Sequence, residues 1–326
     1  MSTVPIPVTV LTGFLGAGKT TLLNRILNGD HGLRIAVLVN DFGSINIDAD
    51  LVAGVESDGD IISLANGCVC CTVRDDLVNA VMRMIDRPEQ PEYIVLEASG
   101  VAEPSSIALT FLDEGLPERI RVDSIMCVVD AEQVFATPEM MELKLRQVAF
   151  ADMLILNKVD LVTRTEIGRI KAWLDDRFHR IRLVEASRGD VPLEILLSVG
   201  RFDPVQLDPP ALGDHFSCTE HDASHDHSQV FKTWSYETDE PVSLAALQES
   251  TRRLPAGVYR CKGVVHTVED PGQRTIVQVV GKRVDIAPGG AWNDLGPCTR
   301  LVVIGSDDGL DEGALREVFD SCLASA

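Results

Sequence analysis

The chain contains the segment Gly13-Phe14-Leu15-Gly16-Ala17-Gly18-Lys19-Thr20, which fits the phosphate-loop pattern G-x-x-x-x-G-K-[ST]. An apolar run at Pro7–Thr12 precedes it and predicts a strand, and a predicted helix follows it to about Asn28. The glycines let backbone N–H groups turn inward around a phosphate, and the helix N-terminus adds its dipole. The stretch therefore predicts a nucleotide site, and the alternative is a glycine-rich turn with a surface lysine.

We expect the phosphates to lie against this loop and the start of the helix. Lys19 would neutralise the β- and γ-phosphates, and the Thr20 hydroxyl is the expected Mg²⁺ ligand. The complete set of expected phosphate contacts is Gly13, Gly16, Ala17, Gly18, Lys19, Thr20 and Thr21.

Four further apolar runs predict a parallel sheet. They are Arg34–Val39, Tyr93–Leu96, Ser124–Val129 and Met153–Leu156, and apolar residues recur at helical spacing over Thr72–Asp86. Strands that are apolar on both faces and joined by helices belong to parallel sheets covered on both sides. The predicted fold class is α/β, a P-loop NTPase domain that binds its ligand at the carboxyl ends of the strands.

The composition changes in the last third of the chain. We predict a P-loop GTPase domain at residues 1–205, a linker rich in Pro and His at residues 206–229, and a smaller α+β domain at residues 230–326. The expected strands of this last domain are Val230–Tyr236, Val258–Thr267, Thr275–Ile286 and Thr299–Ile304, and its expected helices are Leu244–Arg253, capped by Ser243, and Glu312–Leu323.

The charge balance excludes some partners. The chain has 326 residues, and 29 Lys and Arg against 50 Asp and Glu give a formal net charge of −21. An acidic surface of this kind repels nucleic-acid phosphates and anionic lipid. No apolar run approaches the ~20 residues that span a bilayer, and the first residues carry no secretory signal. We expect a soluble cytoplasmic protein without nucleic-acid or membrane partners, whose eight cysteines favour metal or redox chemistry over disulfides.

The segment Asn157-Lys158-Val159-Asp160 follows a predicted strand and is typical of guanine recognition. A carboxylate at Asp160 accepts hydrogen bonds from guanine N1–H and the exocyclic amine, whereas adenine offers an acceptor at N1. We expect Asn157 to hold the base edge, the Lys158 stem to pack against the ring, and the Ala186 N–H to reach guanine O6. The predicted nucleotide is GTP.

Three acidic residues are expected near the γ-phosphate. Glu97 follows the run Tyr93–Leu96, where it would reach Mg²⁺ through water or orient the attacking water. Asp41 and Asp48 lie where a γ-phosphate-sensing switch is expected, and both are also typical of ordinary turns. The expected catalytic residues are Lys19, Thr20, Asp48 and Glu97. A helix-capping or solvated Glu97 is the alternative.

Cys68, Cys70 and Cys71 form a C-x-C-C motif. Three thiols within four residues suit a soft or borderline ion such as Zn²⁺ or Co²⁺, whereas Mg²⁺ prefers oxygen. Three protein ligands leave a coordination position open, which suits a site that passes its metal on. The alternatives are buried apolar cysteines and a thiol redox switch.

A second group of metal-ligating side chains lies in the predicted linker. It consists of His215, Cys218, His221, His225 and His227. Imidazole and thiolate suit Zn²⁺ or Co²⁺, so this segment is a weaker candidate metal site. A polar interdomain loop is the alternative.

The order of these motifs resembles that of the CobW-like GTPases, a group close to the nickel-inserting urease and hydrogenase accessory GTPases. The resemblance is carried by Gly13–Thr20, Cys68–Cys71, Glu97-Ala98-Ser99-Gly100 and Asn157–Asp160, and Tyr259–Gly263 is similar to the family's second domain. It implies a GTP-hydrolysing metallochaperone that holds Zn²⁺ or Co²⁺ through Cys68, Cys70 and Cys71. The implied partner is a client metalloprotein or a metal-cofactor synthesis enzyme, and a homodimer is expected by analogy.

The chain departs from the commoner family pattern in the switch segment. Asp41 stands where many relatives carry Glu, and Ser44 stands where a second Glu is frequent. A carboxylate metal ligand from Asp41 therefore stays open. The alternatives to a metallochaperone are a nucleotide-driven kinase or chelatase subunit and a redox-sensing GTPase.

Overall fold

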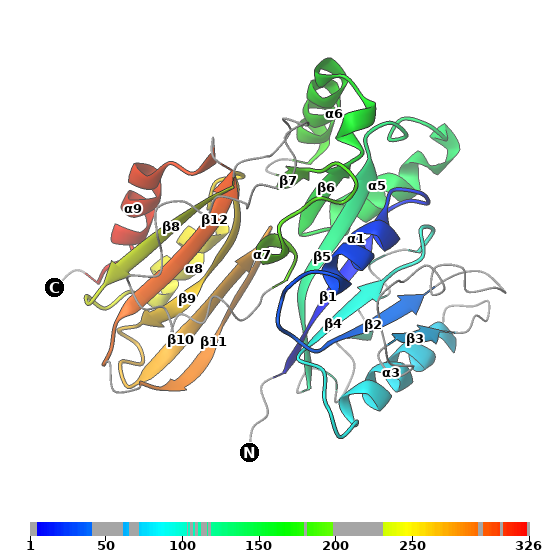
Figure 1. Cartoon of the computed structure of the whole chain (residues 1–326). Coiled ribbons are helices and arrows are strands. Elements are labelled where there is room, and N and C mark those ends of the chain that lie inside the picture. Colours follow the sequence, from blue (N-terminus) through cyan, green and yellow to red (C-terminus); the bar gives the residue numbers. More distant parts are fainter. Residues whose placement is uncertain are drawn as a thin grey trace. The chain divides into compact units, whose positions relative to one another are not determined.

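The structure is a computed structural model that describes residues 5–40, 61–64, 72–102, 119–178, 181–197, 231–292, 296–306 and 309–324, with five single positions between 103 and 118. The chain divides into two compact units, Met1–Ser198 and Val199–Ala326 (Figure 1). The predicted linker 206–229 lies outside the described residues, so its boundaries stay predictions.

The first unit contains a seven-stranded sheet in the order β3-β2-β4-β1-β5-β6-β7. Every pairing between neighbouring strands is parallel, which confirms the predicted α/β class. The strands are β1 (Ile6–Thr12), β2 (Ile35–Asn40), β3 (Ile61–Leu64), β4 (Tyr93–Glu97), β5 (Ile120–Asp130), β6 (Met153–Asn157) and β7 (Leu183–Glu185).

Strand β5 begins at Ile120, before the predicted start at Ser124. The prediction started late because the polar residues Arg121 and Asp123 interrupt the apolar run at the beginning of the strand. Its pairing with β1 shifts register here: Val8 lies opposite Val122, and the next residue, Thr9, lies opposite Ser124. The buried Asp123 at this irregularity accepts a 2.8 Å hydrogen bond from the Tyr93 hydroxyl. An apolar-run criterion excludes such a residue, although the strand continues through it.

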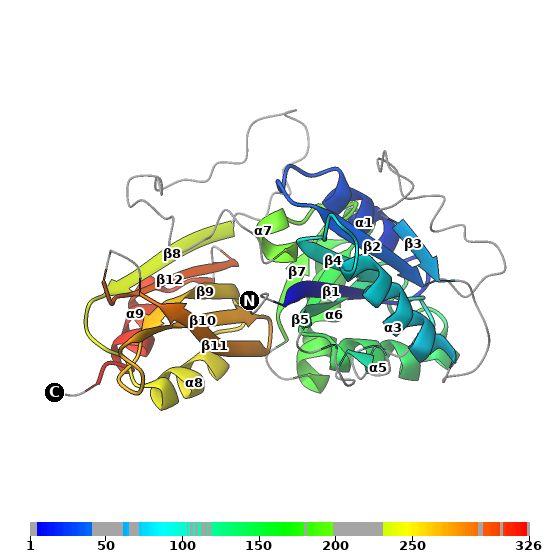
Figure 2. The ribbon, with the colours of Figure 1, turned by 90° about the horizontal axis from the view of Figure 1, so that it is seen from below.

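Helices cover both faces of this sheet. Figure 2 shows α1 and α7 on one side of the strands and α3 and α5 on the other. The predicted stripe of α3 is buried, because Leu77, Val81 and Met84 pack in a cluster with Val8 and Leu38 of the sheet. The helices are α1 (Lys19–Leu27), α3 (Thr72–Ile85), α5 (Met141–Phe150), α6 (Arg164–Arg177) and α7 (Leu193–Leu196), with 3₁₀ turns at Pro138–Met140 and Val159–Leu161.

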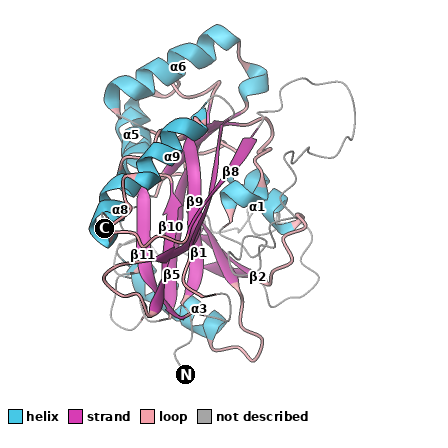
Figure 3. Ribbon diagram, turned by 90° about the vertical axis from the view of Figure 1, so that its left-hand side faces the viewer, coloured by secondary structure: helices cyan, strands magenta, loops and turns pink. Residues whose placement is uncertain are grey.

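The second unit contains a five-stranded antiparallel sheet in the order β11-β10-β9-β12-β8. Leu247, Leu315 and Phe319 from its two helices join Trp234 and Val303 in the buried cluster. Figure 3 shows both helices on one face of the sheet. The elements are β8 (Phe231–Thr238), α8 (Leu244–Arg252), β9 (Val258–His266), β10 (Gln273–Val280), β11 (Arg283–Ala291), β12 (Thr299–Ser306) and α9 (Glu312–Asp320).

One predicted strand of this unit is wrong. The run Thr275–Ile286 is a hairpin, in which β10 pairs with β11 and Val280 lies opposite Arg283. The chain reverses at Gly281, whose φ of 55° is easily adopted by glycine, so this residue is a turn signal inside the apolar run. The predicted cap of α8 is present, since the Ser243 side chain accepts a hydrogen bond from the Ala246 N–H.

No described helix combines the length and the apolar character that crossing a membrane requires.

Candidate nucleotide site

The phosphate loop lies between β1 and α1, at the carboxyl edge of the sheet. Gly13 has a φ of 131° and faces the backbone of Val128 so closely that a Cβ atom would overlap its carbonyl oxygen. Gly18, at the N-terminus of α1, has a φ of 102° and leaves no room for a Cβ beside the Asn157 side chain. Both glycines of the pattern are therefore required by backbone conformation and by close packing.

Lys19 is the buried cation of this loop. Lys19 is only 7% exposed, and its Nζ donates to the carbonyl oxygens of Gly13 at 3.0 Å and Phe14 at 3.3 Å. These bonds hold the ammonium group inside the curve of the loop. A phosphate entering the loop meets a positive charge that is already removed from bulk water, which strengthens their attraction.

Thr20 and Glu97 meet across the sheet edge. The Thr20 hydroxyl donates to Glu97 Oε1 at 2.8 Å, and Glu97 is 2% exposed. Strand pairing causes the contact, because β4 lies beside β1 and places Glu97 opposite Leu11, just before the loop. A hydroxyl and a carboxylate oxygen are ligands that Mg²⁺ accepts, so the two side chains fit the expected ion.

The expected catalytic residues are only partly described. Lys19, Thr20 and Glu97 lie together, while Asp48 and the weaker candidate Asp41 lie outside the described residues. The same holds for the expected metal ligands Cys68, Cys70 and Cys71 and for the group His215, Cys218, His221, His225 and His227. Within the described ranges, no three His, Cys, Asp or Glu side chains gather into a metal site.

Asn157 joins two parts of the expected site. Its Nδ2 donates to the Ala17 carbonyl at 2.9 Å, and its Oδ1 accepts the Gly189 N–H at 2.9 Å. The residue is 2% exposed, so it links the phosphate loop to the turn after β7 inside the protein. The bond to Ala17 uses one of the two N–H donors of Nδ2, so the expected role of Asn157 at the base edge stays a prediction.

The prediction that the Ala186 N–H donates to guanine O6 needs correction. The Ala186 N–H donates to the Leu156 carbonyl at 2.8 Å, which continues the pairing between β6 and β7. This N–H is therefore occupied within the protein. The next two residues, Ser187 and Arg188, form the turn that reaches Gly189, and Arg188 has a left-handed φ of 52°.

The expected guanine-reading carboxylate, Asp160, is exposed at the start of the turn after β6. Its Oδ1 accepts a 2.6 Å hydrogen bond from the Ser187 hydroxyl. The contact links the segment after β6 with the turn after β7. Asp160 thus remains accessible to a base and is oriented by a neighbouring hydroxyl.

Asp130 is a site residue that the sequence analysis did not identify. It ends β5, is 8% exposed, and its Oδ2 lies 2.7 Å from the Lys158 Nζ. Its Oδ1 accepts the backbone N–H groups of Glu132 at 2.9 Å and Gln133 at 3.1 Å. The carboxylate therefore fixes the lysine that is expected beside the purine ring. An acidic residue directly after the run Ser124–Val129 was the available signal, the same one that identified Glu97.

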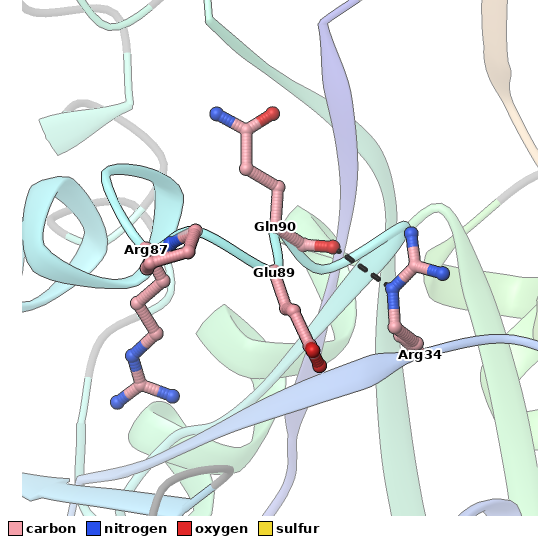
Figure 4. Close-up of a pocket in the computed structure, with 5 residues that line it drawn as sticks. Arg34, Arg87, Glu89 and Gln90 are labelled. Atoms are coloured by element: carbon pink, nitrogen blue, oxygen red, sulfur yellow. Dashed lines mark hydrogen bonds between the residues drawn. The ribbon is translucent and has the colours of Figure 1, made fainter.

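A separate hollow lies at the opposite edge of the sheet. Its volume is about 610 Å³, and it is lined by Arg34, Arg87, Pro88, Glu89 and Gln90, which precede β2 and β4 (Figure 4). The Arg34 Nε donates to the Gln90 carbonyl at 3.1 Å. Because the hollow lies at the amino ends of these strands, it is not part of the nucleotide site.

Parallel topology, a glycine-bounded phosphate loop and the Asn157–Asp160 segment together define a P-loop GTPase. Residues 7–184 match the family described as CobW/HypB/UreG, nucleotide-binding domain, and residues 231–323 match the cobalamin synthesis protein cobW C-terminal domain. The chain belongs to this family, as the resemblance predicted.

Curated relatives align over almost the whole chain. The zinc chaperone CobW of Sinorhizobium sp is 32% identical, with 98% of this chain and 97% of the relative covered. The zinc chaperone CobW of Pseudomonas aeruginosa is 34% identical, with coverages of 98% and 92%. The zinc chaperone YjiA of Escherichia coli is 30% identical, with coverages of 97% and 98%.

Proposed function

We propose that the chain is a GTP-hydrolysing metallochaperone that binds Zn²⁺ or Co²⁺ through Cys68, Cys70 and Cys71 and delivers the ion to a client. The client would be a metalloprotein or a metal-cofactor synthesis enzyme. The family membership and the names of the aligned zinc chaperones support this class of function. The thiolate set favours a borderline ion over Mg²⁺.

The observation that carries the proposal is where the flanks of the C-x-C-C motif lie. Strand β3 ends at Leu64, before the motif, and α3 begins at Thr72, after it. Leu64 pairs with Asn40 at the carboxyl end of β2, and β2 lies beside β4, which ends at Glu97. The last described residue before the motif, Leu64, thus lies at the same sheet edge as the Thr20–Glu97 pair.

In the nucleotide site, Lys19 would neutralise the phosphates and Thr20 would hold Mg²⁺. Glu97 would bind the ion through water or orient the attacking water, with Asp48 as a further expected contributor. Asp160 would select guanine, and an N–H of Ser187 or Arg188 would replace that of Ala186 as the donor to O6, because the Gly189 N–H is bonded to Asn157. Asn157 supports both parts by joining the phosphate loop to this turn.

Hydrolysis and metal binding would be coupled because the chain enters the motif segment from Leu64, at the sheet edge that carries Thr20 and Glu97. Release of the γ-phosphate would change the conformation of the segment between β2 and α3, and thereby the affinity of the thiolates for the metal ion. Such coupling is reciprocal, so GTP and metal would change each other's affinity by the same factor, typically about 5–150-fold.

The test is a titration of reduced protein with Zn²⁺ and with Co²⁺, in the presence of a non-hydrolysable GTP analogue or of GDP. Wild-type protein should show different metal affinities in the two nucleotide states, and Cys68→Ser should lose tight binding in both. Cys298→Ser is the matched control, since it removes a thiol of the second unit that belongs to neither candidate metal site. Equal affinities in both states, or unchanged binding by Cys68→Ser, would rule the proposal out.

A further inference from the structure

Gln147 is a buried amide that neither the nucleotide site nor the metal proposal uses. It lies on α5 and is 1% exposed. Its Nε2 donates to two backbone carbonyls, those of Gly100 and Ala102, each at 3.1 Å. Because both partners are acceptors, only one orientation of the amide satisfies them. These carbonyls belong to the segment that directly follows Glu97.

The segment after Glu97 is a tight turn against the phosphate loop. The Ala102 N–H donates to the Ser99 carbonyl at 3.0 Å, which closes the turn with Gly100 and Val101 at its centre. A Cβ on Gly100 would lie 2.7 Å from the backbone nitrogen of Leu15, so the two backbones are in close contact. The turn therefore lies directly against the loop that is expected to hold the phosphates.

The residue types of the Ser99–Ala102 turn decide which backbone conformation it adopts. A type II turn requires a positive φ at its third residue, which is Val101, and a branched side chain disfavours that conformation. The φ of Val101 is not positive. The position of the turn relative to the loop depends on contacts outside the turn. The Ala98 N–H donates to the Leu11 carbonyl at 2.8 Å before the turn, and Gln147 of α5 holds the carbonyls of Gly100 and Ala102 within it.

Helix α5 is itself attached to the phosphate loop. Lys144 lies one turn before Gln147, and its Nζ is 4.8 Å from the centre of the Phe14 ring. The same ammonium group donates to the carbonyls of Gln133 at 3.0 Å and Ala136 at 2.5 Å. One helix thus contacts both the loop that binds phosphate and the turn that follows Glu97.

We propose that Gln147 is a positioning residue for GTP hydrolysis, which holds the Ser99–Ala102 turn, the segment after Glu97, in place against the phosphate loop. The amide bonds to the backbone after Glu97 and not to Lys19, so we expect its loss to affect the rate of the chemical step. Phosphate binding itself depends on Lys19 and the loop, which remain when Gln147 is replaced. The inference concerns hydrolysis alone and can fail while the metal proposal stands.

The first test is Gln147→Met, which keeps the length of the side chain and removes both donors. We expect kcat for GTP to fall about 10-fold or more, because misplacements of about 1 Å cost up to about 100-fold in rate. KM for GTP should stay within about twofold of wild type. Arg146→Met, an exposed neighbour on α5, is the control and should leave both constants unchanged. A kcat within twofold of wild type for Gln147→Met would overturn the proposal.

The second test, Gln147→Glu, gives a signature that a packing role would not produce. A protonated carboxyl group retains one donor for the two carbonyls, whereas the ionised form has none and repels them. Burial raises the pKa of a carboxyl group toward neutrality. The kcat of Gln147→Glu relative to wild type should therefore rise as the pH is lowered from 8 to 6. Parallel pH profiles, or failure of both variants to fold, would show that Gln147 is only a core residue.

Discussion

The Asn157 side chain donates a 2.9 Å hydrogen bond to the carbonyl oxygen of Ala17, a residue 140 positions earlier in the chain. Through its other end it accepts the Gly189 N–H, so one amide connects the phosphate loop with the turn expected to read the base. We therefore expect recognition of phosphate and recognition of purine to depend on the same buried side chain.

Asn157→Ala should weaken GTP binding and lower stability together. It leaves the Ala17 carbonyl and the Gly189 N–H without their partner, and a buried unsatisfied group costs about 1–3 kcal/mol. Asn157→Asp is the informative companion, because it keeps the acceptor for Gly189 but replaces the donor to Ala17 with a buried carboxylate oxygen that the carbonyl repels. Calorimetric GDP titrations should show weaker binding, and urea unfolding should show lower stability, for both variants than for wild type. An alanine variant of unchanged stability would contradict the geometry.

Asp160→Asn should reduce guanine selectivity without unfolding the protein. The amide oxygen can still accept the Ser187 hydroxyl, but the new NH₂ group faces the N1–H of guanine. Loss of a base-reading hydrogen bond to a charged group costs about 1.5–3 kcal/mol, or at least about 10-fold in affinity. Xanthine, which carries a carbonyl at C2, should bind the variant better than it binds wild type. Competition titrations with GDP, ADP and xanthosine diphosphate measure this, and unaltered ranking would remove Asp160 from base recognition.

Glu97→Gln should change the requirement for Mg²⁺. The amide oxygen still accepts the Thr20 hydroxyl, so the fold is retained, but the negative charge beside the expected ion is lost. We expect the Mg²⁺ concentration for half-maximal GTP hydrolysis to rise and kcat to fall about 10²-fold, the range of acid–base contributions. GDP affinity measured in EDTA should not change. The result that would refute this is an identical Mg²⁺ dependence.

Glu166 should make stability depend on pH in the acidic range. Its backbone hydrogen bond with Thr163, then its bond to the Thr163 side chain, lower the pKa of this carboxyl group. The contribution is therefore complete above the ordinary value of 4.5 and is lost as the pH falls through the lower folded value. Urea unfolding of Glu166→Gln should show a smaller loss of stability over this range than wild type. Glu139→Gln, on another element, is the control.

The four described cysteines should resist alkylation in the native protein. Cys127, Cys261, Cys298 and Cys322 are all buried, and burial raises the pKa of the Cys127 thiol to about 12. Almost none of that thiol is ionised at pH 8, so it is a poor nucleophile. Mass spectrometry after brief iodoacetamide treatment should find label on Cys68, Cys70 and Cys71, and Zn²⁺ should protect them. Rapid labelling of Cys127 would contradict its burial.

The first unit was largely predictable because its strands are apolar on both faces. Such runs stand out in a sequence, and Pro7–Thr12 and Met153–Leu156 coincide closely with β1 and β6. Prediction failed where one residue changes the course of an apolar run. Gly281 reverses the chain inside Thr275–Ile286, and Asp123 is buried inside β5.

The site was predictable in its residue types and less so in its contacts. Motif spacing identified Lys19, Thr20, Glu97 and Asp160, which the structure places at one sheet edge. The bonds of Asn157 and the Ala186 N–H involve atoms far away in the sequence, so no local pattern shows that they are already occupied. Gln147 has no motif at all and is recognisable only from its two carbonyl partners.

The absence of a side chain at Gly13 has a mechanical consequence. Its backbone touches the backbone of Val128 directly, and Val128 is two residues before Asp130, whose carboxylate fixes Lys158. A ligand that displaces the start of the loop must therefore displace strand β5 as well, because no space separates the two backbones. The two halves of a nucleotide should therefore bind with strong non-additivity, so that guanosine and pyrophosphate added separately capture little of the affinity of the intact molecule.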